Sequence, residues 1–182
     1  ESFTKHTIDG SYDGARSVYA ADVDSDGDMD VLGAASGDDD ITWWENDGSE
    51  SFTKHTIDGS YDGARSVFAT DVDSDGDMDV LGAAQLDDDI TWWENDGSES
   101  FTKHTINGSY DGAFFAYAAD VDSDGDMDVL GAAYSDDDIT WWENDGSPST
   151  GGWIEQIIDG DFDNLVYVNA ADVDGDGDMD VL

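Results

Sequence analysis

Short apolar runs alternate with acidic, glycine-containing turns along the whole chain. Residues 15–59 form one full unit of this pattern, and none of its runs keeps a helical period beyond a few residues. The runs have the length of strands and are bounded by turn residues, which indicates antiparallel strands joined by tight connections. The predicted strands are Ser17 to Ala21, Met29 to Ala35, Ile41 to Glu45 and Ser51 to Ile57.

The same unit returns along the chain. The segment Glu1 to Gly10 recurs almost unchanged from Glu50 and from Glu99, which gives a period of 49 residues. The last spacing is 52 residues, because Ser147 to Gly152 contains an insertion. Four strands in a unit of roughly 40–50 residues match one β-propeller blade. The sequence therefore predicts an all-β chain of four-stranded antiparallel blades.

The repeat also divides the chain into a single array of blades. Both ends are predicted to be partial, with a fourth strand at Ser2 to Ile8 and the first two strands of a blade after residue 164. Repeat stacks need neighbours or caps at their ends. A longer chain, two chains sharing one ring, and head-to-tail completion between chains are the alternatives. The predicted divisions are 1–14 (partial), 15–63, 64–112 and 113–164 (complete), and 165–182 (partial).

Pairs of adjacent tryptophans lie in the third predicted strand of each unit. Neighbouring side chains of a strand point to opposite faces, so each pair covers both faces of its sheet. A sheet that is apolar on both faces must be covered on both, as stacked blades are. Core packing is therefore the preferred interpretation, and stacking on sugars is the alternative. The pairs are Trp43 with Trp44, Trp92 with Trp93, and Trp141 with Trp142.

A nine-residue acidic segment, D-x-D-x-D-G-x-x-D, separates the first two predicted strands of each unit and runs from Asp22 to Asp30 in the first. Its five acidic side chains repel one another unless a cation lies among them. Alternating oxygen ligands around a turn-forming glycine are typical of Ca²⁺ loops. An EF-hand is excluded, because its twelfth position requires Glu and Gly33 stands there. We predict a shorter loop, closed by its ninth residue, in which the ion fixes a hairpin.

Three segments together resemble the FG-GAP/VCBS repeats of integrin-α-type β-propellers: Asp22 to Asp30, Val31 to Ala35 and Trp43 to Gly48. The resemblance covers essentially the whole chain and implies Ca²⁺ between the first two strands of each blade, up to four ions in all. It implies four side-chain ligands per loop and a backbone carbonyl from the seventh loop residue. These are Asp22, Asp24, Asp26 and Asp30 with Asp28; Asp71, Asp73, Asp75 and Asp79 with Asp77; Asp120, Asp122, Asp124 and Asp128 with Asp126; and Asp172, Asp174, Asp176 and Asp180 with Asp178.

The net charge of −42 narrows the range of partners. Nucleic acid and anionic membranes are excluded, because both require clustered basic residues and the chain has five Lys and Arg in total. The absence of Cys excludes disulfides, zinc–thiolate sites and a cysteine nucleophile. No apolar run is long enough to span a membrane. The sequence opens at Glu1 without Met or a signal peptide, which indicates a processed form or part of a longer chain.

The positions that vary between near-identical units indicate where a ligand could bind. They fall at the start of the first strand and in the turn between the second and third strands. In a four-stranded meander both places lie at the end opposite the acidic loops. We expect ligand specificity on this face, with relaxed drift at loop edges as the alternative. The candidate residues are Arg16, Arg65, Phe114, Phe115, Gln85 and Tyr134.

Three further features carry weaker predictions. The repeated histidines are expected to be structural or exposed, because the last unit has Gln156 at their position; they are His6, His55 and His104. The acidic turn Asp38 to Asp40 is expected to be solvated, with a weak second cation site as the alternative. Asn107-Gly108-Ser109 is an N-glycosylation sequon.

The combined prediction is a non-catalytic, extracellular or cell-surface Ca²⁺-binding protein that acts as an adhesion or recognition module, or as part of a larger propeller assembly. Its expected partners are copies of itself or the rest of a longer chain, with glycans or cell-surface proteins as ligands. The alternatives are a subunit of a surface layer or head-to-tail fibre and an accessory domain of a carbohydrate-active enzyme. Catalysis is not expected, because every candidate acid belongs to a repeated set and no triad is evident.

Overall fold

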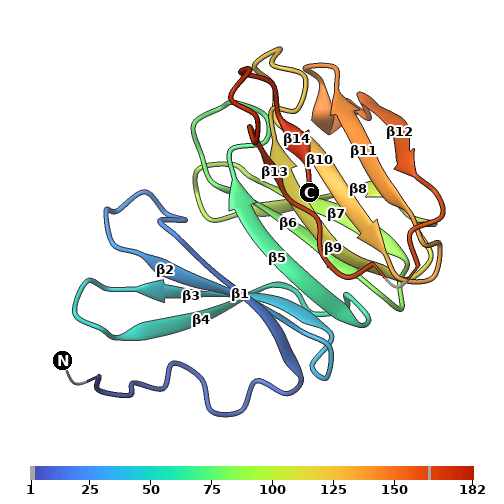
Figure 1. The fold of residues 1–182 in the computed structure, drawn as a ribbon. Coiled ribbons are helices and arrows are strands. Elements are labelled where there is room, and N and C mark those ends of the chain that lie inside the picture. Colours follow the sequence, from blue (N-terminus) through green and yellow to red (C-terminus); the bar gives the residue numbers. More distant parts are fainter. Residues whose placement is uncertain (1–2, 164) are drawn as a thin grey trace.

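The computed structural model describes residues 3–163 and 165–182, and it is built of strands (Figure 1). Three four-stranded sheets follow one another, in the orders β1-β2-β3-β4, β5-β6-β7-β8 and β9-β10-β11-β12, and a two-stranded sheet β13-β14 follows them. The predicted all-β fold of repeated antiparallel blades is confirmed. The strands are β1 (Ala15–Ala21), β2 (Asp30–Ala35), β3 (Asp40–Asn46), β4 (Phe52–Asp58), β5 (Ala64–Thr70), β6 (Asp79–Ala84), β7 (Asp89–Asn95), β8 (Phe101–Asn107), β9 (Ala113–Ala119), β10 (Asp128–Ala133), β11 (Ile139–Asn144), β12 (Trp153–Asp159), β13 (Ala170–Ala171) and β14 (Asp180–Val181), with a 3-10 turn η1 (Pro148–Thr150).

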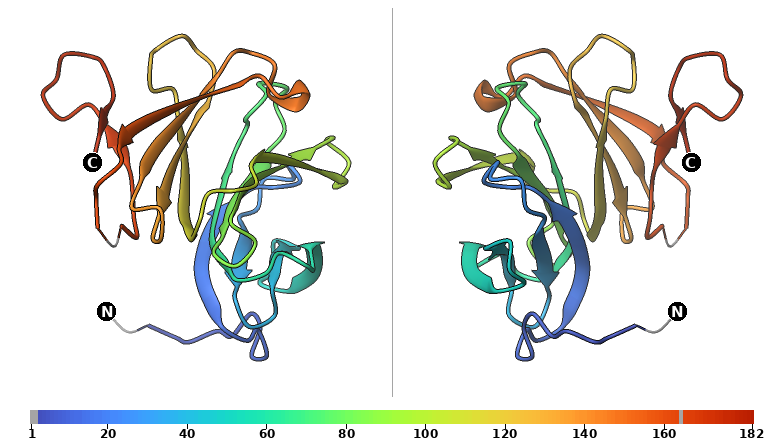
Figure 2. Two further views of the ribbon diagram at one scale, coloured as in Figure 1. Left: turned by 90° about the vertical axis from the view of Figure 1, so that its right-hand side faces the viewer. Right: turned by 90° about the vertical axis from the view of Figure 1, so that its left-hand side faces the viewer.

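The three complete sheets pack face to face, with their first strands innermost (Figure 2). Strand β5 contacts both β1 and β9, so each sheet meets the next along this inner edge. One apolar core, containing Trp43 and Trp93, lies between the first and second sheets. A second core, containing Trp92 and Trp142, lies between the second and third. The two tryptophans of a pair therefore serve opposite interfaces, as the alternation of a strand requires.

Burial decides between core packing and sugar stacking for these tryptophans. Trp43, Trp92, Trp93 and Trp142 are at most 2% exposed, so their rings have no free face for a sugar. Trp44 is also buried, and the ring of Tyr12 packs edge-on against it at a centroid distance of 4.8 Å. Core packing is thus confirmed for Trp43, Trp92, Trp93 and Trp142, whereas Trp44 is buried against Tyr12 outside the cores between sheets.

A tyrosine fixes each of the two links between the three complete blades to the sheet that follows it. The hydroxyl of Tyr61 lies 3.0 Å from the carbonyl oxygen of Gly82 and 2.9 Å from that of Asp89. Its buried ring packs edge-on against Trp93 at 4.9 Å. Position 82 must be glycine, because a Cβ there would lie 2.9 Å from the Trp93 ring. Tyr110 repeats these contacts in the third sheet.

The N-terminal segment differs from the prediction. Residues 3–14 form no strand, although the sequence predicted one at Ser2 to Ile8; Ser2 lies outside the described residues. A fourth strand pairs with the third strand of its own blade, and the described chain supplies no such partner here. Residues 9–14 nevertheless follow the path of the later links, because Gly37 N and Asp38 N both donate to the carbonyl oxygen of Asp13.

The C-terminal segment agrees with the prediction of two strands, which are β13 and β14. Both are short, and Ala171 pairs with Asp180 across them. Leu130 of the third sheet packs with Leu165 and Val168 of this segment in a third apolar cluster. The exact boundaries of the individual blades stay predictions. Within the described residues there is no helix with the length and apolarity needed to cross a membrane.

Candidate metal centre

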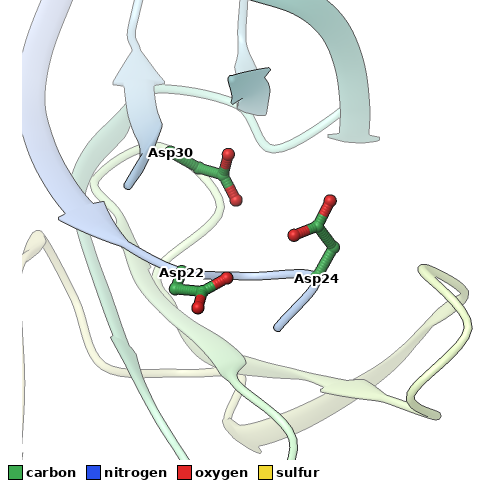
Figure 3. A group of neighbouring side chains, drawn as sticks. All are labelled: Asp22, Asp24 and Asp30. Carbon is green, nitrogen blue, oxygen red and sulfur yellow. The ribbon is translucent and has the colours of Figure 1, made fainter. Parts of the chain in front are cut away.

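The acidic loop of each unit brings three carboxylates together. In the first unit Asp22 directly follows β1, Asp24 lies in the loop, and Asp30 begins β2 (Figure 3). One oxygen from each of the three lies within 4.8 Å of the others. We call these groups the aspartate triads. They are Asp22, Asp24 and Asp30; Asp71, Asp73 and Asp79; Asp120, Asp122 and Asp128; and Asp172, Asp174 and Asp180.

Backbone conformation holds the first two carboxylates of a triad inside the loop. Ser25 (φ 61°) and Gly27 (φ 98°) turn the chain back toward its start, and the value at Gly27 is one that glycine adopts without a Cβ clash. The amide of Gly27 then donates to Oδ2 of Asp22 at 3.0 Å. The amide of Asp26 donates to Oδ1 of Asp24 at 3.2 Å. The glycine therefore has the turn-forming role expected from the sequence.

The ninth loop residue joins the two ends of the loop to the third strand. Asp30 is fully buried, and its Oδ2 accepts from the amide of Val23 at 2.9 Å. Its Oδ1 accepts from the amide of Asn46 at 2.8 Å. Each oxygen keeps a further lone pair, so two amide bonds orient the carboxylate without using up its capacity as a ligand. The second and third units repeat both bonds.

Burial and mutual repulsion disfavour the ionised form of the triad carboxyl groups, which raises the pKa of several of them. Burial raises the pKa of Asp79 to about 7, against the opposing amide bonds from Asn95 and Val72. Burial also raises the pKa of Asp24 and Asp73, with the neighbouring carboxylates adding to the effect. Oδ1 of Asp22 is buried without a hydrogen-bond donor. An oxygen-binding cation would supply what these atoms lack, so the residues present fit a metal ion.

The fifth and seventh loop residues lie outside the triads. Oδ1 of Asp26 accepts from the amide of Asp28 at 2.9 Å. The Asp28 carboxylate lies against Gly48, in the turn between β3 and β4. The ligand roles of these residues and of their equivalents therefore stay predictions. The equivalents are Asp75 and Asp77, Asp124 and Asp126, and Asp176 and Asp178.

An asparagine connects the loops of neighbouring blades, and the sequence reading missed it. Nδ2 of Asn95 donates to the carbonyl oxygen of Val23 in the preceding blade at 3.2 Å, and to that of Met78 in its own loop at 3.1 Å. Asn144 does the same with Val72, at 3.4 Å. The sequence feature that could have indicated this contact is an Asn 16 residues after the ninth loop residue in each of the first three units.

The acidic turns hold the links between blades. Oδ2 of Asp38 accepts from the amide of Asp13 at 3.0 Å, and Oδ1 of Asp39 accepts from the amide of Gly63 at 3.0 Å. Asp40 is buried and lies 3.8 Å from Nζ of Lys54. In the described part of the chain these turns do not bring three carboxylate oxygens together. They serve as acceptors for link amides.

The repeated histidines have structural surroundings. The ring of His55 stacks on Trp43 at 4.6 Å, and its Nε2 lies 2.9 Å from Glu45. His104 has the same arrangement with Trp92 and Glu94. In the third sheet Gln156 bonds to Glu143 at the equivalent place, at 2.7 Å. His6 is exposed and lies 3.7 Å from Glu50.

The residues predicted to form the ligand face, at the end opposite the triads, fall into two groups. Arg16 bonds to Ser36, Arg65 bonds to Gln85, and the ring of Phe114 lies 6.3 Å from that of Tyr134. Phe115 is different, because it packs at 4.4 Å against Tyr167 in the interface with the last segment.

The sequon asparagine lies at the end of β8. Asn107 is half-buried, and its Nδ2 donates to Glu155 in the neighbouring sheet at 3.1 Å. Its Oδ1 accepts from the amide of Ser109 at 2.9 Å. Glycosylation at Asn107 stays a prediction.

Comparison with known proteins agrees with this architecture. The model of a family described as FG-GAP-like repeat matches residues 22–82, 72–131 and 120–182. A solved structure, reported under a title on the specific recognition of non-reducing terminal N-acetylglucosamine by an Agrocybe aegerita lectin, is similar with a TM-score of 0.59 and 21% identity. The similarity covers 89% of this chain and 44% of that one, so this chain spans less than half of its length. No match was found among curated proteins.

Proposed function

The chain belongs to the FG-GAP-like repeat family, and from this premise we propose that it is a Ca²⁺-stabilised, non-catalytic recognition module that works outside the cell. The observation that carries the proposal is the aspartate triad, which recurs in four loops. The same two amide bonds hold the ninth loop residue in the first three triads, while Asp180 of the more exposed fourth triad has only the bond from the amide of Val173 among the described residues.

Calcium suits the triads better than other common ions. The donors are all carboxylate or carbonyl oxygens, which excludes a site selected by sulfur or imidazole. Ca²⁺ accepts six to eight oxygens in flexible geometry, whereas Mg²⁺ demands a near-ideal octahedron. A loop that offers three converging carboxylates plus the fifth and seventh residues can reach the higher number. Extracellular modules bind Ca²⁺ at roughly 10⁻⁴–10⁻³ M, which matches the free Ca²⁺ they meet there.

A recognition role is supported by the contrast between the two ends of the blades. The triad end is nearly identical in every unit, while the opposite end varies at Arg16, Arg65 and Phe114. Variation on a conserved scaffold is typical of binding surfaces. The lectin-like fold of the similar structure favours a glycan or a glycosylated cell-surface protein as the ligand. The histidines and acids that could act in catalysis are engaged in repeated structural contacts.

A second candidate function, assembly between chains, is favoured by the outer face of the first sheet. Val18 is 72% exposed there, although its equivalent Val67 is 4% exposed inside an interface between sheets. A cavity of about 510 Å³ adjoins this face and is lined by Val18, Val31 and Trp44. A further blade, from another copy or from a longer chain, would cover it. Light scattering of a Val18→Asp variant beside the unchanged chain tests whether copies associate here.

The decisive test of the main proposal is a calcium titration. We expect calorimetry to show binding to about four sites, following the number of triads, and the melting temperature to rise with Ca²⁺ by mass action. Chelation should reverse the rise, and equal Mg²⁺ should produce a smaller one. A melting temperature that is the same with millimolar Ca²⁺ and with chelator would overturn the proposal.

A further inference from the structure

The two arginines of the chain stand out in its charge distribution. Arg16 and Arg65 open β1 and β5, which are adjacent innermost strands, at the end opposite the triads. In a chain with 47 Asp and Glu, neither arginine forms an ion pair with a carboxylate among the described residues. The lysines of β4 and β8 behave differently: Lys54 lies 3.8 Å from Asp40, and Lys103 lies 3.0 Å from Asp58.

A β-bulge presents each arginine. The pairing of β1 with β2 skips Arg16, since Ala15 pairs with Ala35 and Ser17 with Ala34. The pairing of β5 with β6 skips Arg65 in the same way, and that of β9 with β10 skips Phe114. An extra residue in one strand re-aims its side chain out of the regular ladder, and such bulges are common beside binding sites. The same kind of bulge therefore presents two arginines and one phenylalanine along the inner edge.

Neutral partners hold the arginines in place and leave their charge uncompensated. Nε of Arg16 donates to the hydroxyl of Ser36 at 2.8 Å, and Nη2 of Arg65 donates to the side-chain carbonyl of Gln85. The guanidinium of Arg65 also lies over the ring of Phe114, 5.0 Å from its centroid. Nε of Arg65 is buried and has no acceptor. Burial, and to a smaller extent the charge of Arg16, lower the pKa of Arg65.

The third blade adds an aromatic surface beside the arginines. Phe114 and Tyr134 occupy the positions that hold Arg65 and Gln85 in the second blade. Their rings lie 6.3 Å apart, and Tyr134 is 42% exposed. The guanidinium of Arg65 therefore adjoins this aromatic pair, and Arg16 lies on the adjacent innermost strand at the same end of the blades.

Building on the recognition role proposed above, we infer that Arg16, Arg65, Phe114 and Tyr134 form a binding site for an acidic glycan, by holding a sugar ring that carries an oxyanion. Each guanidinium presents paired N–H groups that match the oxygens of a carboxylate or a sulfate ester. The aromatic ring supplies a flat apolar surface for the sugar. A neutral sugar would leave both cations without a counter-charge. Repulsion from the rest of the acidic surface is screened beyond about 8 Å at physiological salt.

The test is a calorimetric titration of the Ca²⁺-loaded chain with three hexasaccharides: unsulfated chondroitin, chondroitin 4-sulfate and a neutral N-acetylglucosamine hexamer. We expect at least one acidic probe to bind about tenfold or more tightly than the neutral one, as charge-assisted hydrogen bonds to guanidinium would produce. Binding of the unsulfated probe identifies the carboxylate as sufficient. Binding of the sulfated probe alone identifies the sulfate.

Variants then tie the binding to the arginines. Arg16→Gln and Arg65→Gln should each weaken the acidic probe about tenfold or more, and Arg65→Lys should weaken it less. Lys103→Gln, which removes a paired cation, should leave the affinity unchanged. Because Arg16 is exposed, its variant retains the fold, and a melting curve of each variant checks this. The inference is overturned if the neutral hexamer binds as tightly as the acidic ones, if no hexamer binds, or if folded Arg→Gln variants bind normally. Calcium-dependent melting would persist in all three cases, so the proposed calcium role is tested separately.

Discussion

The side-chain amide of Asn95 donates to the carbonyl oxygen of Val23 across the interface between the first two blades, over 3.2 Å. Both residues also contact a triad. The amide of Val23 donates to Asp30, and the amide of Asn95 donates to Asp79. A continuous path of hydrogen bonds therefore joins the first triad to the second, and Asn144 extends it to the third.

The bond between Asn95 and Val23 can be measured with a matched pair of variants. Asn95→Ala should reduce the free energy of unfolding by about 1 kcal/mol more than Asn46→Ala does, which is the typical net value of one hydrogen bond. Asn46 is a suitable control, because its Nδ2 donates within its own loop, to Met29 at 3.1 Å. Urea unfolding of both variants in saturating Ca²⁺ gives the comparison. Equal losses would show that the bond between blades contributes nothing.

Removing one triad carboxylate should remove one ion. Asp73→Asn takes away a charge but keeps the side-chain shape, so we expect the calorimetric stoichiometry to fall by one site. The smaller ion load should also reduce the Ca²⁺-dependent rise in melting temperature. Asp163→Asn, an exposed position outside the loops, is the charge-matched control and should behave as the unchanged chain does. A full complement of ions in Asp73→Asn would exclude this carboxylate as a ligand.

The close approach of strand β6 to a tryptophan predicts a sensitive glycine. Gly82→Ala places a Cβ 2.9 Å from the ring of Trp93 and 3.3 Å from the carbonyl oxygen of Ser66. Overpacking of this kind costs about 1–3 kcal/mol. Gly59→Ala, which meets only a Thr56 methyl at 3.4 Å, should change the stability little. Thermal unfolding of the two variants distinguishes them, and similar melting temperatures would contradict the packing argument.

The buried hydroxyl of Tyr61 should contribute to stability at neutral pH. Tyr61→Phe leaves the carbonyl groups of Gly82 and Asp89 without their side-chain donor, and we expect a loss of about 1–2 kcal/mol. Tyr167→Phe is the control, because Tyr167 is 54% exposed. Chemical unfolding at pH 7 tests the difference. A loss no larger than that of the control would exclude the role given to this hydroxyl.

The link tyrosines also predict an alkaline limit to stability. Burial raises the pKa of Tyr61 well above its ordinary value of 10.0, and burial raises that of Tyr110 as well. A raised pKa in the folded state contributes stability that is intact below pH 10 and is lost as the pH rises, because the unfolded chain then ionises first. Each such tyrosine should remove up to about 1.4 kcal/mol per pH unit above pH 10. Unfolding curves between pH 9 and pH 11.5 should show a shallower decline for Tyr61→Phe than for the unchanged chain.

Much of the fold could be predicted from local sequence, because each unit contains its own apolar runs, paired tryptophans and acidic loop. Alternating apolar runs placed the strands of the first blade within two residues, and paired tryptophans placed the cores between sheets. The spacing of the loop carboxylates predicted a cation-binding loop, and three of the four carboxylates expected in each loop converge, while Asp26 and its equivalents lie outside the triads.

The remaining features depend on partners that the local sequence does not contain. Residues 3–9 are identical to Phe52–Asp58, yet they form no strand while the latter form β4. The difference is the neighbouring strand β3, which supplies the hydrogen bonds. The hydrogen bond from Asn95 to the preceding blade likewise depends on the distance between the two blades. The bulges at Arg16 and Arg65 depend on the register in which two strands pair. None of these quantities can be read from one strand alone.

The path through Val23 and Asn95 has a consequence for how the array would respond to falling calcium. One hydrogen bond joins the first loop to the second and another joins the second to the third, so the free energy of emptying one of these loops would depend on the state of its neighbour. With the proposed ions bound, such a row of nearest-neighbour couplings would lose them in a concerted way rather than one after another. Longer arrays of these blades would then show a steeper threshold in calcium concentration than short ones, as coupled switches do.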